Sequence, residues 1–295
     1  MKLDEDLRAA AAALPRVDRT DVAEARRITA GPAPGVPEGV TVVEHTVPSA
    51  DGHTVRLRRY RPDRRTRDGV VYHVHGGGFI LGDLDAGHLR NAEIARDVGA
   101  DVVAVEYRLA PEWPFPTPLE DVYAGLAWIG DGVVLHGLSA GGALAAGAAL
   151  LARDRGGPAI SGQLLVSPVV DDRLTTPSSR RLIDTPALTR RDLEICWSAY
   201  LGSVVPGSAE VSPYAAPARA DLAGLPRTYV SVAELDPLRD EAIDFARALL
   251  AAGVPVELHL FPGTFHGSLA VPGAAVSVRQ RTEETTVLRT LLGER

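Results

Sequence analysis

The sequence predicts an α/β fold, in which a mostly parallel central sheet is covered by helices on both faces. From residue 69 onward, short runs rich in Val, Leu and Ile alternate with segments of helical pattern. These runs are apolar throughout rather than at every second residue, which is typical of strands that are buried on both faces. The chain has 295 residues, of which 45% are hydrophobic, so it can form one large core.

The amino-terminal part has a different pattern. Residues 1–30 are predicted to be helical, and the Gly- and Pro-rich stretch 31–37 breaks the regular structure. Strands are predicted over 40–48 and 53–60, because apolar and polar residues alternate there, and the turn dipeptide Asp51-Gly52 joins them. We therefore expect an antiparallel hairpin at one edge, which makes the sheet mixed.

Strands and helices then follow one another along the chain. The predicted strands are 70–75, 102–107, 133–138, 162–170, 228–233 and 254–261, and the predicted helices are 88–98, 119–129, 141–153, 238–252 and 279–292. Residues 171–213 interrupt this alternation and lie over the carboxyl edge of the strands, where ligands bind in open α/β sheets. We expect a helical cap segment over 1–40, a core over 41–170 and 214–295, and a cap insertion over 171–213.

A candidate nucleophile lies between the strand 133–138 and the Ala-rich helix that follows. The run 137–141 reads Gly-Leu-Ser-Ala-Gly, and its glycines allow a tight strand-to-helix turn that exposes the hydroxyl of Ser139. The helix N-terminus beside it offers free N–H groups to an oxyanion. The alternative interpretation is a Gly-Ser turn in which Ser139 merely caps the helix.

A serine hydroxyl needs a positioned base, which in such hydrolases follows it in the chain. Only His259 and His266 come after Ser139. His259 alternates with leucines inside a predicted strand, whereas His266 follows Pro262-Gly263 in a predicted loop at the carboxyl edge. The pattern favours His266 as the base and leaves His259 as the alternative.

The acid that orients the base is expected at the end of the preceding strand. Glu234 and Asp236 follow the strand 228–233, and Asp240 lies a helical turn further on. Asp236 precedes Pro237 at a turn that resembles a helix cap, and one carboxylate oxygen can serve the cap while the other serves the histidine. We therefore favour Asp236 over Glu234.

The glycine run His75-Gly76-Gly77-Gly78 comes directly after a buried strand. Three successive glycines let the main chain turn its N–H groups toward an anion. The N–H groups of Gly77, Gly78 and Ala140 are the expected oxyanion hole, and such donors are each worth roughly 3–4 kcal/mol. The alternative is a flexible glycine loop, which the apolar flanks of this run disfavour.

The overall composition excludes several classes of function. The net charge is −7 with no basic cluster beyond Arg64, Arg65 and Arg67, so neither nucleic acid nor an anionic membrane is an expected partner. The only lysine is Lys2, which excludes mechanisms that need an internal lysine. Cys196 is the only cysteine, and the amino terminus has no secretory pattern, so we expect a cytoplasmic protein.

Together these motifs resemble the hormone-sensitive-lipase-like esterases, the bacterial family IV carboxylesterases of the α/β-hydrolase fold. The matching segments run in the family order over about residues 70–270: His75-Gly76-Gly77-Gly78-Phe79, Tyr107-Arg108-Leu109-Ala110-Pro111-Glu112, the elbow with Gly142, Asp236-Pro237-Leu238-Arg239-Asp240 and His266-Gly267. The chain departs from the family at Leu138, where an acid is common, and at Glu106, where Asp is common. Leu138 removes a polar contact that could brace the oxyanion loop.

The resemblance implies a serine carboxylesterase with the triad Ser139, Asp236 and His266, an oxyanion hole at Gly77, Gly78 and Ala140, and a helical cap. The implied partner is a small ester with a short or medium acyl chain, with no metal or organic cofactor, and the family admits a homodimer. Two alternatives stay open: a related amide, formamide or lactone hydrolase with the same triad, and a non-catalytic receptor such as the plant gibberellin receptors. The presence of His266 disfavours the receptor.

Overall fold

A single mixed sheet of eight strands forms the centre of the molecule, in the order β1-β2-β4-β3-β5-β6-β7-β8. The computed structural model describes residues 2–31, 35 and 37–293. The strands are β1 (Val40–Pro48), β2 (Thr54–Pro62), β3 (Val70–Val74), β4 (Asp101–Glu106), β5 (Val133–Leu138), β6 (Ile160–Val166), β7 (Thr228–Leu235) and β8 (Val256–Phe265). Strands β1 and β2 are antiparallel, β2 pairs antiparallel with β4, and the remaining pairs are parallel.

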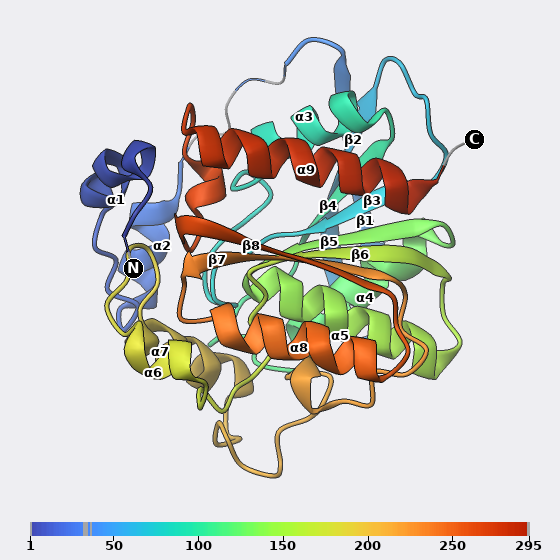
Figure 1. Ribbon diagram of the computed structural model, residues 1–295. Helices are drawn as coiled ribbons and strands as arrows, with labels where there is room; N and C mark the ends of the chain where they lie inside the picture. The colour runs from blue at the N-terminus through green and yellow to red at the C-terminus, as the bar shows by residue number, and fades with distance from the viewer. Residues whose placement is uncertain (1, 32–34, 36, 294–295) are drawn as a thin grey trace.

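Helices cover both faces of this sheet (Figure 1). They are α1 (Arg8–Ala13), α2 (Val22–Thr29), α3 (His88–Val98), α4 (Thr117–Ile129), α5 (Ala140–Arg155), α6 (Pro177–Arg181), α7 (Arg190–Leu201), α8 (Arg239–Ala251) and α9 (Ala275–Leu292). Short 3-10 helices span Glu5–Leu7, Pro217–Arg219 and Ser268–Ala270. Helices α3 and α9 lie on one face, and α4, α5 and α8 lie on the other.

Successive residues of the central strands send their side chains into two separate apolar layers. Leu135 and Leu165 belong to the layer shared with α4 and α5, whereas Val134 and Leu164 belong to the layer shared with α3 and α9. Both layers are apolar, so these strands read as continuous apolar runs in the sequence. The predicted α/β-hydrolase architecture, with an antiparallel hairpin at one edge, is therefore confirmed.

The last strand is longer than predicted. We expected residues 254–261 as the strand and Pro262-Gly263 as a loop, but β8 continues to Phe265. Proline is tolerated there because β8 is an edge strand, and among the described residues no strand pairs with its outer side. The pairing of β7 with β8 is irregular between Ala233 and Leu235. The extension leaves His266 directly after the end of the strand.

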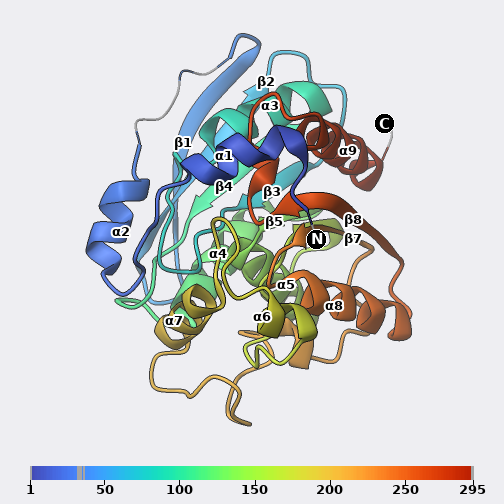
Figure 2. The ribbon, with the colours of Figure 1, turned by 60° about the vertical axis from the view of Figure 1, so that its left-hand side comes forward.

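The amino-terminal helices and the 171–213 insertion lie at the same end of the sheet (Figures 1 and 2). Arg19 connects them, because its guanidinium lies 2.9 Å from a carboxylate oxygen of Asp192 on α7. The break at 31–37 falls partly outside the described residues. In the part of the chain that the structure describes, we find no helix that is long and apolar enough to cross a membrane.

Candidate active site

The site lies where the order of the strands reverses. From β3 the chain passes to β4 on one side, and then returns to β5 on the other side of β3. The loops that follow β3 and β5 therefore separate above the sheet, which leaves a crevice at its carboxyl edge. The glycine loop after β3 and Ser139 after β5 border this crevice.

Ser139 occupies a strained turn between β5 and α5. Its backbone has φ 55° and ψ −120°, a combination that is costly for a residue with a Cβ atom. The turn is tight, since a Cβ on Gly141 would lie 2.1 Å from the carbonyl oxygen of Val74. Ser139 is the N-cap residue of α5, as the alternative interpretation expects, but its side chain makes no capping hydrogen bond to the helix, so its hydroxyl is left for other partners.

Three side chains that are distant in sequence meet at this turn. Nε2 of His266 lies 3.0 Å from Oγ of Ser139, and Nδ1 of His266 lies 2.7 Å from Oδ2 of Asp236. The Asp236 residue is 0% exposed, and its Oδ1 accepts a 2.9 Å hydrogen bond from the backbone N–H of Leu238. The carboxylate thus holds the proton of the imidazole on Nδ1, which leaves the lone pair of Nε2 facing the hydroxyl.

The alternative residues have other partners. His259 lies on the edge strand β8, where its Nδ1 is 2.7 Å from Oε1 of Glu283. Glu234 accepts a 2.7 Å hydrogen bond from the backbone N–H of Gly263. Asp240 accepts a 2.7 Å hydrogen bond from the backbone N–H of Ser178. The geometry therefore brings His266 and Asp236 to Ser139, and not these three.

The glycine loop after β3 is held rigidly. Gly78 has φ 62°, and a Cβ there would lie 2.3 Å from Sγ of Cys196 on α7. The hydroxyl of Tyr107 donates a 2.9 Å hydrogen bond to the carbonyl of His75, and their rings stack with centroids 4.2 Å apart. Tyr107 thus supports the loop in this chain, in which Leu138 supplies no carboxylate.

Burial decides the chemistry of two groups beside this loop. Burial raises the pKa of the Cys196 thiol to about 12, so this thiol packs as an apolar group and is a poor nucleophile. Burial also lowers the pKa of His75 to about 4, so the imidazole is neutral near pH 7.

The pocket above Ser139 has a volume of about 750 Å³. Its walls include Arg26 from the amino-terminal segment, Leu188 from the insertion, Leu138 from the elbow and Leu269 from the turn after His266. Arg26 ties α2 to the segments after β3 and β4: it donates hydrogen bonds of 2.8 Å and 2.9 Å to the carbonyls of Ile80 and Ala110.

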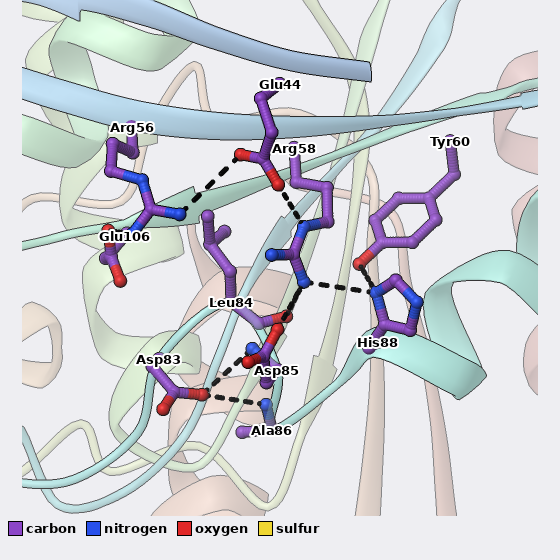
Figure 3. A network of polar contacts seen from close by, with 10 residues as sticks. All are labelled: Glu44, Arg56, Arg58, Tyr60, Asp83, Leu84, Asp85, Ala86, His88 and Glu106. Atoms are coloured by element: carbon purple, nitrogen blue, oxygen red, sulfur yellow. Dashed lines mark hydrogen bonds and ion pairs between the residues drawn. The ribbon is translucent and has the colours of Figure 1, made fainter. Parts of the chain in front are cut away.

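Another wall, between Gly82 and α3, is tied to the edge of the sheet by Arg58 (Figure 3). The guanidinium of this β2 residue donates to Oδ1 of Asp85 at 2.5 Å, to Nδ1 of His88 at 3.1 Å and to Oε1 of Glu44 at 2.5 Å. A guanidinium can only donate, so Nδ1 of His88 carries the lone pair. Burial and the nearby Arg58 charge lower the pKa of His88, which favours the neutral ring that accepts from Arg58.

Sequence reasoning missed a second group of polar residues that line the same pocket, among them His73 and His136. These two are directly paired in the register of β3 and β5. Each lies inside a run whose composition predicts an apolar strand. The one available signal was their similar distance from the carboxyl ends of the two predicted strands.

A serine on a strand-to-helix elbow, with an imidazole and a buried carboxylate behind it, is the arrangement found in α/β hydrolases. A family of proteins with the alpha/beta hydrolase fold matches residues 71–270, and the chain belongs to this family. The resemblance to the hormone-sensitive-lipase-like esterases is thereby confirmed.

Individual relatives are similar over most of the chain. Carboxylesterase NlhH of Mycobacterium tuberculosis is 40% identical over 283 residues, which cover 88% of this chain and 86% of that one. Esterase LipI of the same species is 38% identical over 237 residues, with 76% of this chain and 73% of that one covered. The solved structure of a bacterial heroin esterase superimposes with a TM-score of 0.93 at 43% identity, over 99% of both chains.

Proposed function

We propose that the protein hydrolyses small carboxylic esters through Ser139 as nucleophile, His266 as base and Asp236 as the acid that orients the base. Its family and its esterase relatives make it a carboxylic ester hydrolase. The residue assignment is supported above all by one geometric observation. The imidazole of His266 lies 3.0 Å from the Ser139 hydroxyl and 2.7 Å from the Asp236 carboxylate.

The reaction follows from the position of these atoms. Oγ of Ser139 attacks the ester carbonyl carbon while Nε2 of His266 takes the hydroxyl proton, and Asp236 stabilises the imidazolium. The N–H groups of Gly77, Gly78 and Ala140 stabilise the oxyanion of the tetrahedral intermediate. The imidazolium then returns its proton to the departing alkoxide, which leaves the acyl group on Ser139. Water activated by Nε2 releases the acid and restores the serine.

The pocket supports short and medium acyl chains as substrates. Its volume of about 750 Å³ lies in the range of small-molecule sites, and Leu138, Leu188 and Leu269 supply apolar wall. The amino-terminal segment 1–40 and the insertion 171–213 form the cap in this proposal, over a core made of 41–170 and 214–295. The contributions of Arg26 and Leu188 to the pocket wall support this division.

We also infer a cytoplasmic location, supported by the single, buried cysteine Cys196. A homodimer is proposed at the free edge of β8, where the side chains of Leu258 and Leu260 are exposed. Light scattering of the purified chain tests the dimer. A single species at the monomer mass of 31.2 kDa at micromolar concentration would exclude it.

The nucleophile is tested by comparing Ser139→Ala with Ser277→Ala, which removes a buried hydroxyl outside the pocket. We expect Ser139→Ala to lower kcat for 4-nitrophenyl butyrate by about 10⁴-fold or more and to abolish labelling by a fluorophosphonate. Ser277→Ala should keep both. Retention of labelling in Ser139→Ala would refute the assignment. A parallel panel of esters, lactones and amides of equal size separates ester hydrolysis from the alternatives.

A further inference from the structure

The pocket above Ser139 does not end on an apolar floor. It extends between the sheet and helices α3 and α9, where His73, His136, Arg90, Gln280 and Glu284 line it. None of these side chains takes part in the ester hydrolysis described above. We refer to these five residues as the polar end of the pocket.

Two neutral histidines form the floor of the polar end. His73 and His136 are paired in the register of β3 and β5, and their Nδ1 atoms lie 3.1 Å apart. One ring must donate from Nδ1 and the other must accept, because two lone pairs or two protons would repel. Burial lowers the pKa of both rings, to about 3 for His136, so neither carries a charge near pH 7. Of the two Nε2 atoms, one is therefore an N–H donor and the other an acceptor.

Several polar atoms at the polar end have no protein partner. Nε2 of His136, Nε of Arg90 and Oε1 of Glu284 are buried and make no hydrogen bond to the described residues. His136 and Glu284 are each only 1% exposed. A buried donor or acceptor without a partner is costly, so such groups normally face a ligand or ordered water. Here they line a pocket that opens onto the nucleophile.

The charged side chains at the polar end already have partners of opposite charge. Arg90 lies 3.0 Å from a carboxylate oxygen of Glu284 and 3.6 Å from one of Glu93. A bound anion would face these carboxylates, and a bound cation would face Arg90. A neutral group that both donates and accepts fits the unpartnered atoms without adding charge.

We propose that the polar end is a specificity subsite for esters in which one arm, acyl or alcohol, ends in a neutral donor–acceptor group such as a hydroxyl. The subsite deepens the proposed function and rests on it, because the arm must extend from a carbonyl held at Ser139. His136 precedes Ser139 by three residues on β5, so the arm has to span about 10 Å at roughly 3.3 Å per residue.

The test uses two series of substrates with arms of graded length. The first compares acetates of linear alcohols with monoacetates of the corresponding terminal diols, and the second compares linear acyl esters with their ω-hydroxy analogues. Esters that end in a carboxylate complete each series. At the length that reaches the polar end, we expect kcat/KM for the hydroxyl ester to exceed that of the methyl-ended ester roughly tenfold in one series, which is the worth of one hydrogen bond. The carboxylate ester should be the poorest of the three.

Variants then locate the preference. His136→Leu and Glu284→Leu should bring the hydroxyl-to-methyl ratio to one or below. The matched control is Gln163→Met, since Gln163 is also fully buried with an unpartnered Oε1 but does not line the pocket. This control should keep the wild-type ratio. Because the ratio is measured within one protein, it does not depend on the amount of folded enzyme.

Three results would overturn the subsite: a ratio of one or below at every length in both series of the wild type, a preference for the carboxylate ester, or a ratio unchanged in both leucine variants. The first would mean that ordered water alone satisfies the polar end. Failure of the proposed function looks different, because the methyl-ended esters would then not be hydrolysed either.

Discussion

The ring of Phe79 in the glycine loop after β3 lies nearly parallel to the ring of Tyr200 on α7, with centroids 3.9 Å apart and an interplanar angle of 6°. Both rings are buried. The loop that carries the expected oxyanion donors is therefore packed directly against the 171–213 insertion. A displacement of α7 should therefore also displace the backbone of Gly77 and Gly78, which immediately precede Phe79.

Removing this ring should impair both stability and catalysis. We expect Tyr200→Ala to lower the free energy of unfolding by about 3–5 kcal/mol, as for other large buried aromatic residues. It should also lower kcat by roughly a hundredfold, because oxyanion donors that shift by about 1 Å lose their alignment. Tyr200→Phe keeps the ring and should keep kcat within a few-fold. Urea unfolding and steady-state kinetics measure the two effects, and equal kcat in both variants would contradict the coupling.

The carboxylate behind His266 should matter far more than its neighbour in sequence. Asp236→Asn keeps the shape but favours the wrong imidazole tautomer, so we expect kcat to fall by about 10⁴-fold. Glu234→Gln changes a residue that binds the backbone of Gly263. It should leave kcat within about threefold, as typical for a group without a role in the chemistry. Similar losses in the two variants would contradict the assignment of Asp236.

Arg26 should hold the amino-terminal segment over the pocket. Arg26→Ala removes two hydrogen bonds to main-chain carbonyls and a bidentate ion pair with Glu112. We expect α2 to be cleaved faster in limited proteolysis and KM to rise several-fold, since hydrogen bonds to charged groups are worth about 1.5–3 kcal/mol when buried and less at this half-exposed site. Arg27→Ala, which loses only an exposed pair within α2, is the matched control. Equal proteolysis of the two variants would show that Arg26 does not anchor the segment.

The buried histidine His136 makes stability depend on pH in a defined direction. Its folded pKa is about 3 because burial disfavours the imidazolium, whereas an unfolded histidine has a pKa of about 6.5. Below about pH 6.5 only the unfolded state protonates residue 136, so His136 by itself lowers the free energy of unfolding by roughly 1 kcal/mol per pH unit toward pH 3. Above about pH 6.5, the imidazole of residue 136 is neutral in both the folded and the unfolded state, so the free energy of unfolding no longer depends on its titration.

His136→Leu removes the titrating imidazole and with it this loss of stability at low pH. The free energy of unfolding of the wild type minus that of the variant should therefore decrease as the pH is lowered from 7 to 4. The groups that face His136 are His73 on β3, Arg90 on α3 and Glu284 on α9. The lowered pKa of His73 acts on stability in the same direction as that of His136, and the raised pKa of Glu284 acts in the opposite direction. Both His73 and Glu284 are present in the wild type and in the variant, so their effects largely cancel when the two proteins are compared at each pH. Parallel stability curves would contradict the prediction.

The sequence alone determined the fold class and the local geometry of the site. Strands that are buried on both faces must be apolar throughout, and a serine between glycines at a strand-to-helix junction can adopt few conformations. The buried strands and this turn can therefore both be predicted from a short stretch of sequence. The choice between Glu234 and Asp236 rested only on the turn before Pro237, since both acids follow the same strand. The length of β8 was misjudged, because the tolerance of an edge strand for Pro262 depends on its place in the sheet.

Only the tertiary structure decided which distant groups meet. Ser139 and His266 are 127 residues apart in the chain, and their 3.0 Å contact depends on the order and length of several strands between them. The pairing of His73 with His136 likewise requires the parallel register of β3 and β5, which no local pattern encodes. Local propensities act over a few residues, whereas a pocket is defined by the packing of the whole sheet. Sequence motifs therefore predict most of the chemistry at Ser139, but they do not predict the polar end of its pocket.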